Sequence, residues 1–450
     1  MVWLIFVGFS STPTNSAFYN YHLEILSQQK NKGHKMNMDL NRRQLLQGAS
    51  LATLMGMPIR NLLAQKGALR TPTADHVILY RLGGGMTHID TWDPKPGRPT
   101  AGPFNPITTS ADGIQISEIF PQVARQMKHA ALIRSVTSPI AAHGLASYLI
   151  QTSYTPNNNV IHPGVGSMAA HERHQLGALP AFVSINGNAQ KAGYLGQKCE
   201  AYYIGRPGEK DPYLSFPAGI SKIRGNKRIE ILERMNKRKS NYFGAPEMKN
   251  VESSIDDAVA LMQSPALKSM EIDNDNPDLQ RYGDTDFGRA SLLARNLVES
   301  GVRFVQVNRG GFDNHGGIED AMINHGEIMD PALASLIEDL NVRGMLDRTM
   351  VVMVSEFGRT PRVNTNAGRD HWSRVFSVFF AGGGVKPGTV VGASDIDGMY
   401  PDSRPVKPQD IPATICHALG ADWTKTVITP QERPFKLTQE GSDPVFELFA

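Results

Sequence analysis

The stretch DFGRASLLARNLVESGVRFVQVN, residues 286–308, gives the clearest fold signal in the chain. A helical pattern runs from Phe287 to Ser300, and Gly301 follows at the position where a left-handed residue commonly ends a helix. The run Val302–Val307 is rich in β-branched residues and predicts a buried strand. A helix that passes directly into a strand is typical of α/β proteins.

Similar short strands recur on both sides of this unit, separated by helical patterns such as Ser117–Met127. This alternation predicts an α/β fold in which helices cover a mostly parallel sheet. The sequence becomes charged over about 220–274, and we interpret this segment as a helical insertion rather than a second catalytic domain. The other expected strands are Val77–Leu82, Ala131–Val136, Phe182–Ile185, Met350–Ser355 and Val375–Ala381.

Composition narrows the class of protein. The 450 residues contain 46 Lys and Arg against 43 Asp and Glu, and these charges are scattered, so nothing suggests nucleic acid as a partner. The two cysteines, Cys199 and Cys416, stand far apart and provide neither a disulfide framework nor a cysteine-based zinc site. Cys416 lies in an apolar helical run and is expected in the core.

An export signal is predicted near the N-terminus. Arg42 and Arg43 precede a weakly apolar stretch, 47–57, which is too short to span a bilayer, and a small-residue region follows near Ala64. This order is typical of a twin-arginine (Tat) signal peptide, which we assign to 36–64. It implies contact with the Tat translocase during export and a periplasmic or extracellular location.

Residues 1–35 precede this signal, although such signals normally lie near the initiator. We therefore interpret 1–35 as an upstream extension that is not native, with Met36 or Met38 as the start. Apart from the signal, no segment approaches the length of a membrane-spanning helix, so no stable membrane span is expected in the mature form.

Polar residues gather just after the expected strands, where ligands bind in open α/β sheets. One such residue alone is more often a turn residue or a helix cap, but four groups are hard to attribute to capping. Carboxylates and imidazoles from separate strand ends suit a divalent metal, and the lack of cysteine ligands favours zinc, manganese or iron. The groups are GGGMTHIDTWD at 83–93, NRGGFDNH at 308–315, EFGRT at 356–360 and GRDHW at 368–372.

The same motifs carry a family resemblance. They are GGGMTHIDTWDPKPG at 83–97, the stretch at 286–308 quoted above, GGFDNH at 310–315, SEFGRTP at 355–361 and GRDHW at 368–372. Together they resemble the bacterial family labelled domain of unknown function 1501, over 75–450. Members of this family are commonly Tat-exported and are grouped by fold with the alkaline phosphatase and sulfatase superfamily. The resemblance implies an alkaline-phosphatase-like three-layer sandwich with a mostly parallel central sheet.

The resemblance also implies a set of metal ligands. In that superfamily an Asp ends the first strand, an Asp and a His follow a middle strand, and a late acidic residue precedes a further His. This chain departs from the pattern at Phe357, where the superfamily has a His, so one imidazole of the usual two-metal site is missing. The positions implied here are Asp90 with His88 as the alternative, then Asp313 with His315, then Glu356 and then His371. Asp370 joins these candidate metal ligands from the strand-end group GRDHW.

The nucleophile is left open at this point. His143 occupies the position where the resemblance places the sulfatase nucleophile, so it is a candidate ligand or base, with water attacking directly. Alternatively, Thr137 or Ser138 serves as the nucleophile. Arg359 and Arg369 are candidate oxyanion-binding residues, since a guanidinium suits tetrahedral oxyanions, although either arginine is equally suited to pair with a nearby carboxylate.

These observations lead to one main functional hypothesis and one alternative. The main hypothesis is an exported, metal-dependent hydrolase that acts on a phosphate or sulfate ester of a small molecule or a polysaccharide. The alternative is a non-catalytic protein that keeps the hydrolase fold and binds a sulfated or phosphorylated polymer. The departures at Phe357 and His143 motivate this alternative.

Overall fold

The computed structural model describes residues 72–173, 175–211, 214–243, 256–429 and 431–449. The predicted Tat signal at 36–64 and the upstream extension at 1–35 lie outside these residues. The predicted insertion, about 220–274, is described except for 244–255, and its main element is the helix α7 (Lys222–Phe243).

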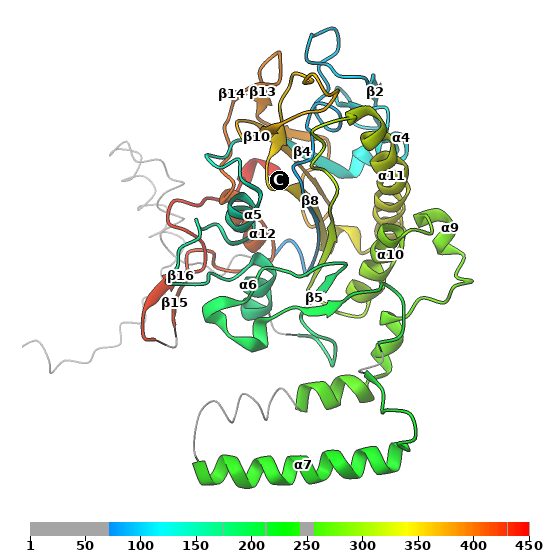
Figure 1. The fold of residues 1–450 in the computed structure, drawn as a ribbon, viewed down its shortest axis with the longest axis vertical. Coiled ribbons are helices and arrows are strands. Elements are labelled where there is room, and N and C mark those ends of the chain that lie inside the picture. Colours follow the sequence, from blue (N-terminus) through cyan, green and yellow to red (C-terminus); the bar gives the residue numbers. More distant parts are fainter. Residues whose placement is uncertain (1–71, 174, 212–213, 244–255, 430, 450) are drawn as a thin grey trace, which may run out of the picture. The chain divides into compact units, whose positions relative to one another are not determined.

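A mostly parallel sheet forms the centre of the described chain (Figure 1). Its strands lie in the order β12-β4-β11-β8-β1-β7-β5-β6, and within this sheet β11 is the strand that runs antiparallel to its neighbours. The strand bounds are β1 His76–Leu82, β4 Ala130–Val136, β5 Phe182–Ile185, β6 Tyr202–Ile204, β7 Phe304–Arg309, β8 Thr349–Ser355, β11 Phe376–Ala381 and β12 Thr389–Val391. All six predicted strands are confirmed, with ends within two residues.

Short antiparallel pairs lie outside the main sheet. They are β2 (Pro106–Thr108) with β3 (Gln115–Ser117), β9 (Gly358–Arg359) with β10 (His371–Trp372), β13 (Ala393–Ser394) with β14 (Pro401–Ser403), and β15 (Thr426–Ile428) with β16 (Pro434–Lys436). The pair β9-β10 matters most for function, because it carries two of the predicted site residues, Arg359 and His371.

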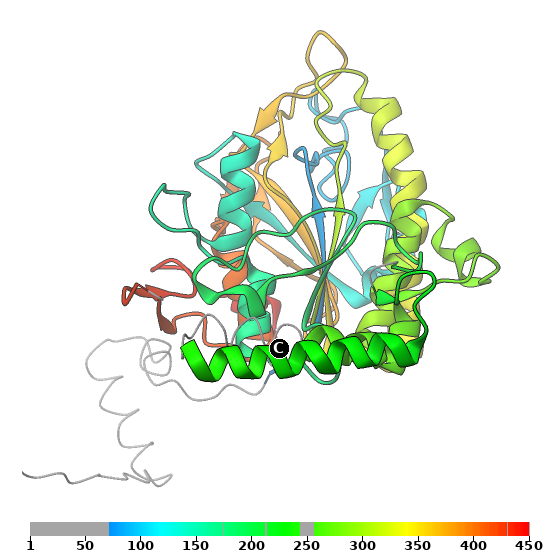
Figure 2. The same ribbon diagram turned by 60° about the horizontal axis from the view of Figure 1, so that its bottom comes forward.

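Helices cover both faces of the sheet, as Figures 1 and 2 show. Alternate residues of β1 face opposite layers: Ile78 and Tyr80 pack in the core with α10 and α11, whereas Val77 and Leu79 pack in the core with α6 and α12. The three-layer α/β fold predicted from the sequence is thus confirmed. The helices are α4 Pro121–Gln126, α5 His143–Thr152, α6 Val165–Glu172, α9 Asp278–Tyr282, α10 Asp286–Glu299, α11 Ile318–Val342 and α12 Asp410–Ala418.

The unit at 286–308 forms as predicted. Helix α10 ends at Glu299, and Gly301 adopts a positive φ of 97°. The Gly301 amide bonds the Val298 carbonyl, and the Val302 amide bonds the Leu297 carbonyl, both at 3.0 Å, which is the Schellman pattern of helix termination. The chain therefore turns directly from α10 into β7.

The helix predicted over Ser117–Met127 is too long at its start. Ser117 is the last residue of β3, and α4 begins only at Pro121. Proline suits the first turn of a helix because its φ is fixed and it lacks an amide proton. Cys416 is fully buried in α12 as expected, and burial raises the pKa of its thiol to about 12. Among the described helices, none is long and apolar enough to cross a membrane.

Candidate metal centre

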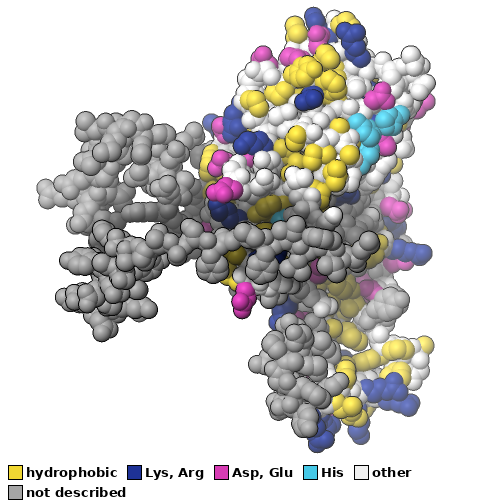
Figure 3. All heavy atoms as spheres, turned by 60° about the vertical axis from the view of Figure 1, so that its left-hand side comes forward, with side chains coloured by type: hydrophobic (Ala, Val, Ile, Leu, Met, Phe, Trp, Pro, Cys, Tyr) yellow, Lys and Arg dark blue, Asp and Glu magenta, His cyan; other side chains and the backbone are white. Residues whose placement is uncertain are grey.

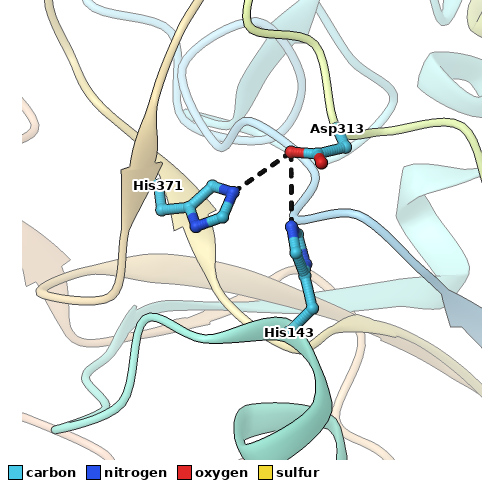
Figure 4. Close-up of side chains that lie close together, drawn as sticks. All are labelled: His143, Asp313 and His371. Carbon is cyan, nitrogen blue, oxygen red and sulfur yellow. Dashed lines mark hydrogen bonds and ion pairs between the residues drawn. The ribbon is translucent and has the colours of Figure 1, made fainter.

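The candidate site lies beyond the carboxyl ends of β1, β7 and β8, the edge where α/β sheets bind ligands. Asp313 follows β7, and Glu356 directly follows β8. His143 is the first residue of α5, and His371 lies on β10. Figure 4 shows His143 and His371 reaching Asp313 from these separate elements. The structure thus brings together side chains far apart in sequence.

Three imidazoles converge on one carboxylate oxygen. Oδ1 of Asp313 lies 3.0 Å from Nε2 of His315, 3.1 Å from Nε2 of His371 and 3.3 Å from Nε2 of His143. The Nε2 atoms of His315 and His371 are 3.2 Å apart. This group, which we call the His-Asp cluster, consists of His143, Asp313, His315 and His371. Figure 3 shows histidine side chains gathered at the surface beside acidic ones.

The opposite nitrogen of each imidazole is bound to an oxygen acceptor. Nδ1 lies 2.7 Å from Glu356 Oε1 in His143, 2.9 Å from the Ala141 carbonyl in His371, and 2.7 Å from Asp370 Oδ1 in His315. Since carbonyls and ionised carboxylates only accept, each Nδ1 carries the proton, and in a neutral ring Nε2 then presents a lone pair. Lone pairs therefore face a carboxylate oxygen, an arrangement that requires a cation or shared protons between them.

This donor set fits a divalent metal ion. His143, Asp313 and His371 each offer one ligand atom, and these atoms lie within 4.8 Å of one another. Nε2 of His143 is buried and makes no hydrogen bond within the described residues, although it lies close to Asp313. Oxygen acceptors behind ligating imidazoles are also usual in metal sites, because they fix the tautomer and the ring orientation.

Phe357 forms an apolar wall of the cluster. It is fully buried, and its ring centre lies 4.8 Å from that of His143 and 4.9 Å from that of His371. Phe357 thus restricts the rings of His143 and His371. Its side chain packs against the two imidazoles and offers no metal ligand.

The glycines at 83–85 allow the β1 loop to approach the loop that carries Asp313. A Cβ on Gly84, whose φ is +115°, would lie 2.5 Å from the Asp313 backbone nitrogen. One on Gly85 would lie 2.7 Å from the Phe357 ring. The carbonyls of both glycines accept hydrogen bonds from the Arg359 guanidinium. These glycines therefore serve backbone packing around the cluster.

Arg359 holds the Asp313 carboxylate. Its fully buried guanidinium bonds Asp313 Oδ1, and it also donates to the carbonyl of Arg369 at 2.9 Å. Burial raises the pKa of Asp313, but the hydrogen bond and the positive charge of Arg359 outweigh that effect and hold the pKa well below its usual range. Of the two functions considered for Arg359, the structure shows the carboxylate pairing.

Asp90 and Arg369 form a separate, fully buried ion pair, the carboxylate pairing that was one of the two functions considered for Arg369. The guanidinium Nε lies 2.7 Å from Oδ2 of Asp90, and Nη2 lies 2.9 Å from Oδ1. Arg369 also donates to the carbonyls of Thr360 and Pro361. With both carboxylate oxygens bound by the arginine, Asp90 is not presented to a metal, and Arg369 is not presented to an oxyanion.

Within the described residues, His88, Thr137 and Ser138 form no hydrogen bond or ion pair with the His-Asp cluster. His88 is buried, with Nε2 2.8 Å from the Gly398 carbonyl, and burial lowers its pKa. The Ser138 hydroxyl contacts the Ile140 backbone, and the Thr137 amide bonds the Val406 carbonyl. The predicted ligands that do come together are Asp313, His315 and His371, with Glu356 and Asp370 behind two imidazoles.

Comparison with known proteins places this geometry in context. The family model described as Protein of unknown function (DUF1501) matches residues 74–449. No curated protein matches the chain. The match spans the whole sheet and every residue of the His-Asp cluster.

Similar solved structures share low identity with this chain. A sulfatase, PsFucS1 from Pseudoalteromonas sp., is 14% identical, with 80% of this chain and 70% of that chain covered and a TM-score of 0.33. The lipoteichoic acid synthase LtaP from Listeria monocytogenes is 10% identical (77% and 72% covered, TM-score 0.35). A protein in the alkaline phosphatase superfamily from Vibrio parahaemolyticus is 10% identical (79% and 68%, TM-score 0.33).

Proposed function

The chain belongs to the DUF1501 family, and from that premise we propose, on the chemistry of its own site, that it is a metal-dependent hydrolase of a phosphate or sulfate ester, exported by the Tat pathway. The observation that carries the proposal is the convergence of three imidazole Nε2 atoms on Oδ1 of Asp313. Nitrogen and carboxylate donors of this kind suit zinc, manganese or iron.

His143, Asp313 and His371 would hold the metal ion, and His315 lies beside them. When bound, a divalent cation supplies Lewis-acid polarisation of an ester oxygen and activation of water. Arg359 keeps the Asp313 carboxylate ionised and oriented. Phe357 excludes water from one side of the cluster.

His315 is the side chain placed to move a proton. It is half exposed, and Asp370 holds its Nδ1 at 2.7 Å. A carboxylate behind an imidazole fixes its tautomer and stabilises its protonated form, as general acid-base catalysis requires. In the proposed hydrolysis, the oxygen of water bonds to phosphorus or sulfur as the water gives up a proton. The ester bond breaks, and the departing oxygen takes up one proton and leaves as the alcohol.

One observation favours direct attack by water. Within the described residues, the hydroxyls of Thr137 and Ser138 form no hydrogen bond to the cluster, and His143 occupies the position where a nucleophile was expected. The same observation keeps a second candidate in view, a protein that binds a sulfated or phosphorylated polymer without cleaving it. The two candidates differ in turnover and not in metal content.

Elemental analysis of the purified protein tests the proposal. We expect stoichiometric metal in the wild type and its loss in the Asp313→Ala, His371→Ala double variant. The matched control is Asp284→Ala, His171→Ala, which removes the same residue types outside the site and should keep the metal. Absence of metal from the wild type would overturn the proposal. Metal binding without cleavage of any phosphate or sulfate ester would favour the binding protein.

A further inference from the structure

A polar pocket lies at the start of the loop that leads from β7 to Asp313. It has a volume of about 340 Å³ and lies beyond the carboxyl ends of β5, β6 and β7, beside the start of α10. Its size suits one small ligand group rather than an extended molecule. Its lining includes Asn186, Tyr203, Asp286, Phe287, Asn308 and Arg309.

Arg309 is the unusual member of this lining, because its guanidinium forms no ion pair within the described residues. The side chain is partly buried, and its Cζ lies 5.6 Å from the centre of the Phe287 ring. Nε is buried and has no hydrogen-bond partner in the described chain. A desolvated cation without a counter-charge is costly, and burial accordingly lowers the pKa of Arg309.

One nitrogen of the Arg309 guanidinium has a structural role, because it hydrogen-bonds a histidine. Nη2 lies 3.0 Å from Nδ1 of His325, and Nε2 of His325 lies 2.9 Å from the Gly311 carbonyl. Because arginine only donates, the His325 ring accepts at Nδ1 and donates at Nε2. This chain of contacts steadies the loop before Asp313 but gives Nη1 of Arg309 no hydrogen-bond partner within the described residues, and unlike Nε this nitrogen is not fully buried.

The rest of the lining suits a hydroxylated ligand. Asp286 is an exposed carboxylate that can accept from hydroxyl groups, and it forms no ion pair within the described residues. Tyr203 leaves 51% of its surface exposed, so its ring offers a flat apolar face. Asn308 is not available, because its amide is bonded to Ser184, Ile185 and Gly187.

We propose that this pocket binds an acidic sugar unit, with Arg309 binding its sulfate or carboxylate group, Asp286 accepting from its hydroxyls and Tyr203 packing on its face. Guanidinium groups bind such anions through paired, charge-assisted hydrogen bonds. The sugar unit would be a part of the substrate other than the ester that is cleaved. That last identification rests on the proposed function, whereas binding itself does not.

Calorimetric titration of the full chain tests the proposal, with D-galactose 6-sulfate and D-glucuronate as acidic probes and D-galactose and inorganic sulfate as comparisons. At least one acidic sugar should bind the wild type about tenfold or more tightly than galactose or sulfate. Arg309→Gln should weaken that binding about tenfold or more, since a charge-assisted hydrogen bond is lost. Tyr203→Ala should weaken it without touching Arg309 or its contacts.

The His371→Ala variant separates this pocket from the metal centre. Acidic sugars should bind this variant as they bind the wild type, although its metal and its ester cleavage are lost. Sugar binding by a wild type that carries no metal and cleaves no ester would overturn the proposed function and leave this pocket assigned. The pocket proposal is overturned if neither acidic sugar binds the wild type, or if folded Arg309→Gln and Tyr203→Ala both bind normally. It is also overturned if sulfate binds as tightly as the sugars, or if binding is lost in His371→Ala alone.

Discussion

Nδ1 of His143 lies 2.7 Å from Oε1 of Glu356, so the carboxylate that directly follows β8 fixes the imidazole that begins α5. The same Glu356 oxygen accepts the backbone amide of Gly84 at 2.8 Å. One buried carboxylate therefore links the ends of β1 and β8 to the His-Asp cluster. Its position behind a ligand candidate is the usual place for a residue that orients a metal-binding histidine.

Glu356→Gln should weaken metal affinity about 10- to 100-fold, because the amide keeps the size of the side chain but loses its charge and its simple acceptor role. Competition with a metal chelator measures this change. Asp370→Asn is the matched control, since Asp370 holds His315 in the same way but has a side chain 54% exposed. We expect a smaller loss there, and equal losses would contradict the assigned importance of Glu356.

Gly84→Ala should distort the cluster. A methyl group at this position would meet backbone atoms of Phe312 and Asp313, and the positive φ is itself unfavourable for alanine. Backbone cannot move aside as a flexible side chain can, so we expect lower stability, by about 1–3 kcal/mol, and reduced metal content. Urea unfolding and elemental analysis provide the two measurements. Gly97→Ala is the comparison, because its φ is also positive but no atom lies within 4 Å of the added Cβ.

Asp90→Asn should destabilise the fold without removing the metal. Asp90 and Arg369 are both fully buried, and removing one charge from such a pair leaves the other uncompensated, at a cost of about 3–5 kcal/mol. The Asp90→Asn, Arg369→Gln double variant should lose less than the sum of the single variants. Unfolding curves give these energies. A stable Asp90→Asn protein without metal would instead restore Asp90 as a ligand.

Local sequence patterns predicted most of the fold because they reflect local physics. The helix at 286–299 and the strand after it follow from apolar periodicity and from a glycine that the turn at 301 requires. The direction of β11 could not be read in this way. An isolated apolar run is the same in a parallel and an antiparallel strand.

Part of the candidate site was also predictable, since residues after parallel strands meet at one edge of the sheet. That rule, with the family resemblance, brought Asp313 and His371 into one site. It failed for Asp90, because nothing in a linear sequence shows that Arg369 lies opposite, 279 positions away. Arg309 was missed for a similar reason. An arginine at the end of a strand is common in sequences, and only the structure shows that Arg309 has no ion-pair partner in the described chain.

His162 should make the protein less stable as the pH falls. It is buried in an aromatic group, stacked on Tyr154 with ring centres 3.9 Å apart, and the Tyr148 hydroxyl lies 3.0 Å from its Nδ1. Burial lowers its pKa to about 4, whereas the unfolded chain titrates near 6.5. Between these values the unfolded state binds more protons, so the free energy of unfolding is largest above about pH 6.5 and falls toward pH 4.

The size of this effect between pH 7.5 and pH 4 is on the order of 3 kcal/mol, since one pKa unit corresponds to about 1.4 kcal/mol. Urea unfolding of the wild type and of His162→Gln, at several pH values from 4 to 7.5, measures it. The difference at pH 7.5 reports the packing lost in the variant, because His162 is neutral there in both states. The titration of His162 is tested by how the difference in the free energy of unfolding between the two proteins changes with pH. Other titrating groups are the same in both proteins, so their contributions cancel. Since the variant cannot take up this proton, the two curves should converge as the pH falls, and parallel curves would show that His162 is not responsible.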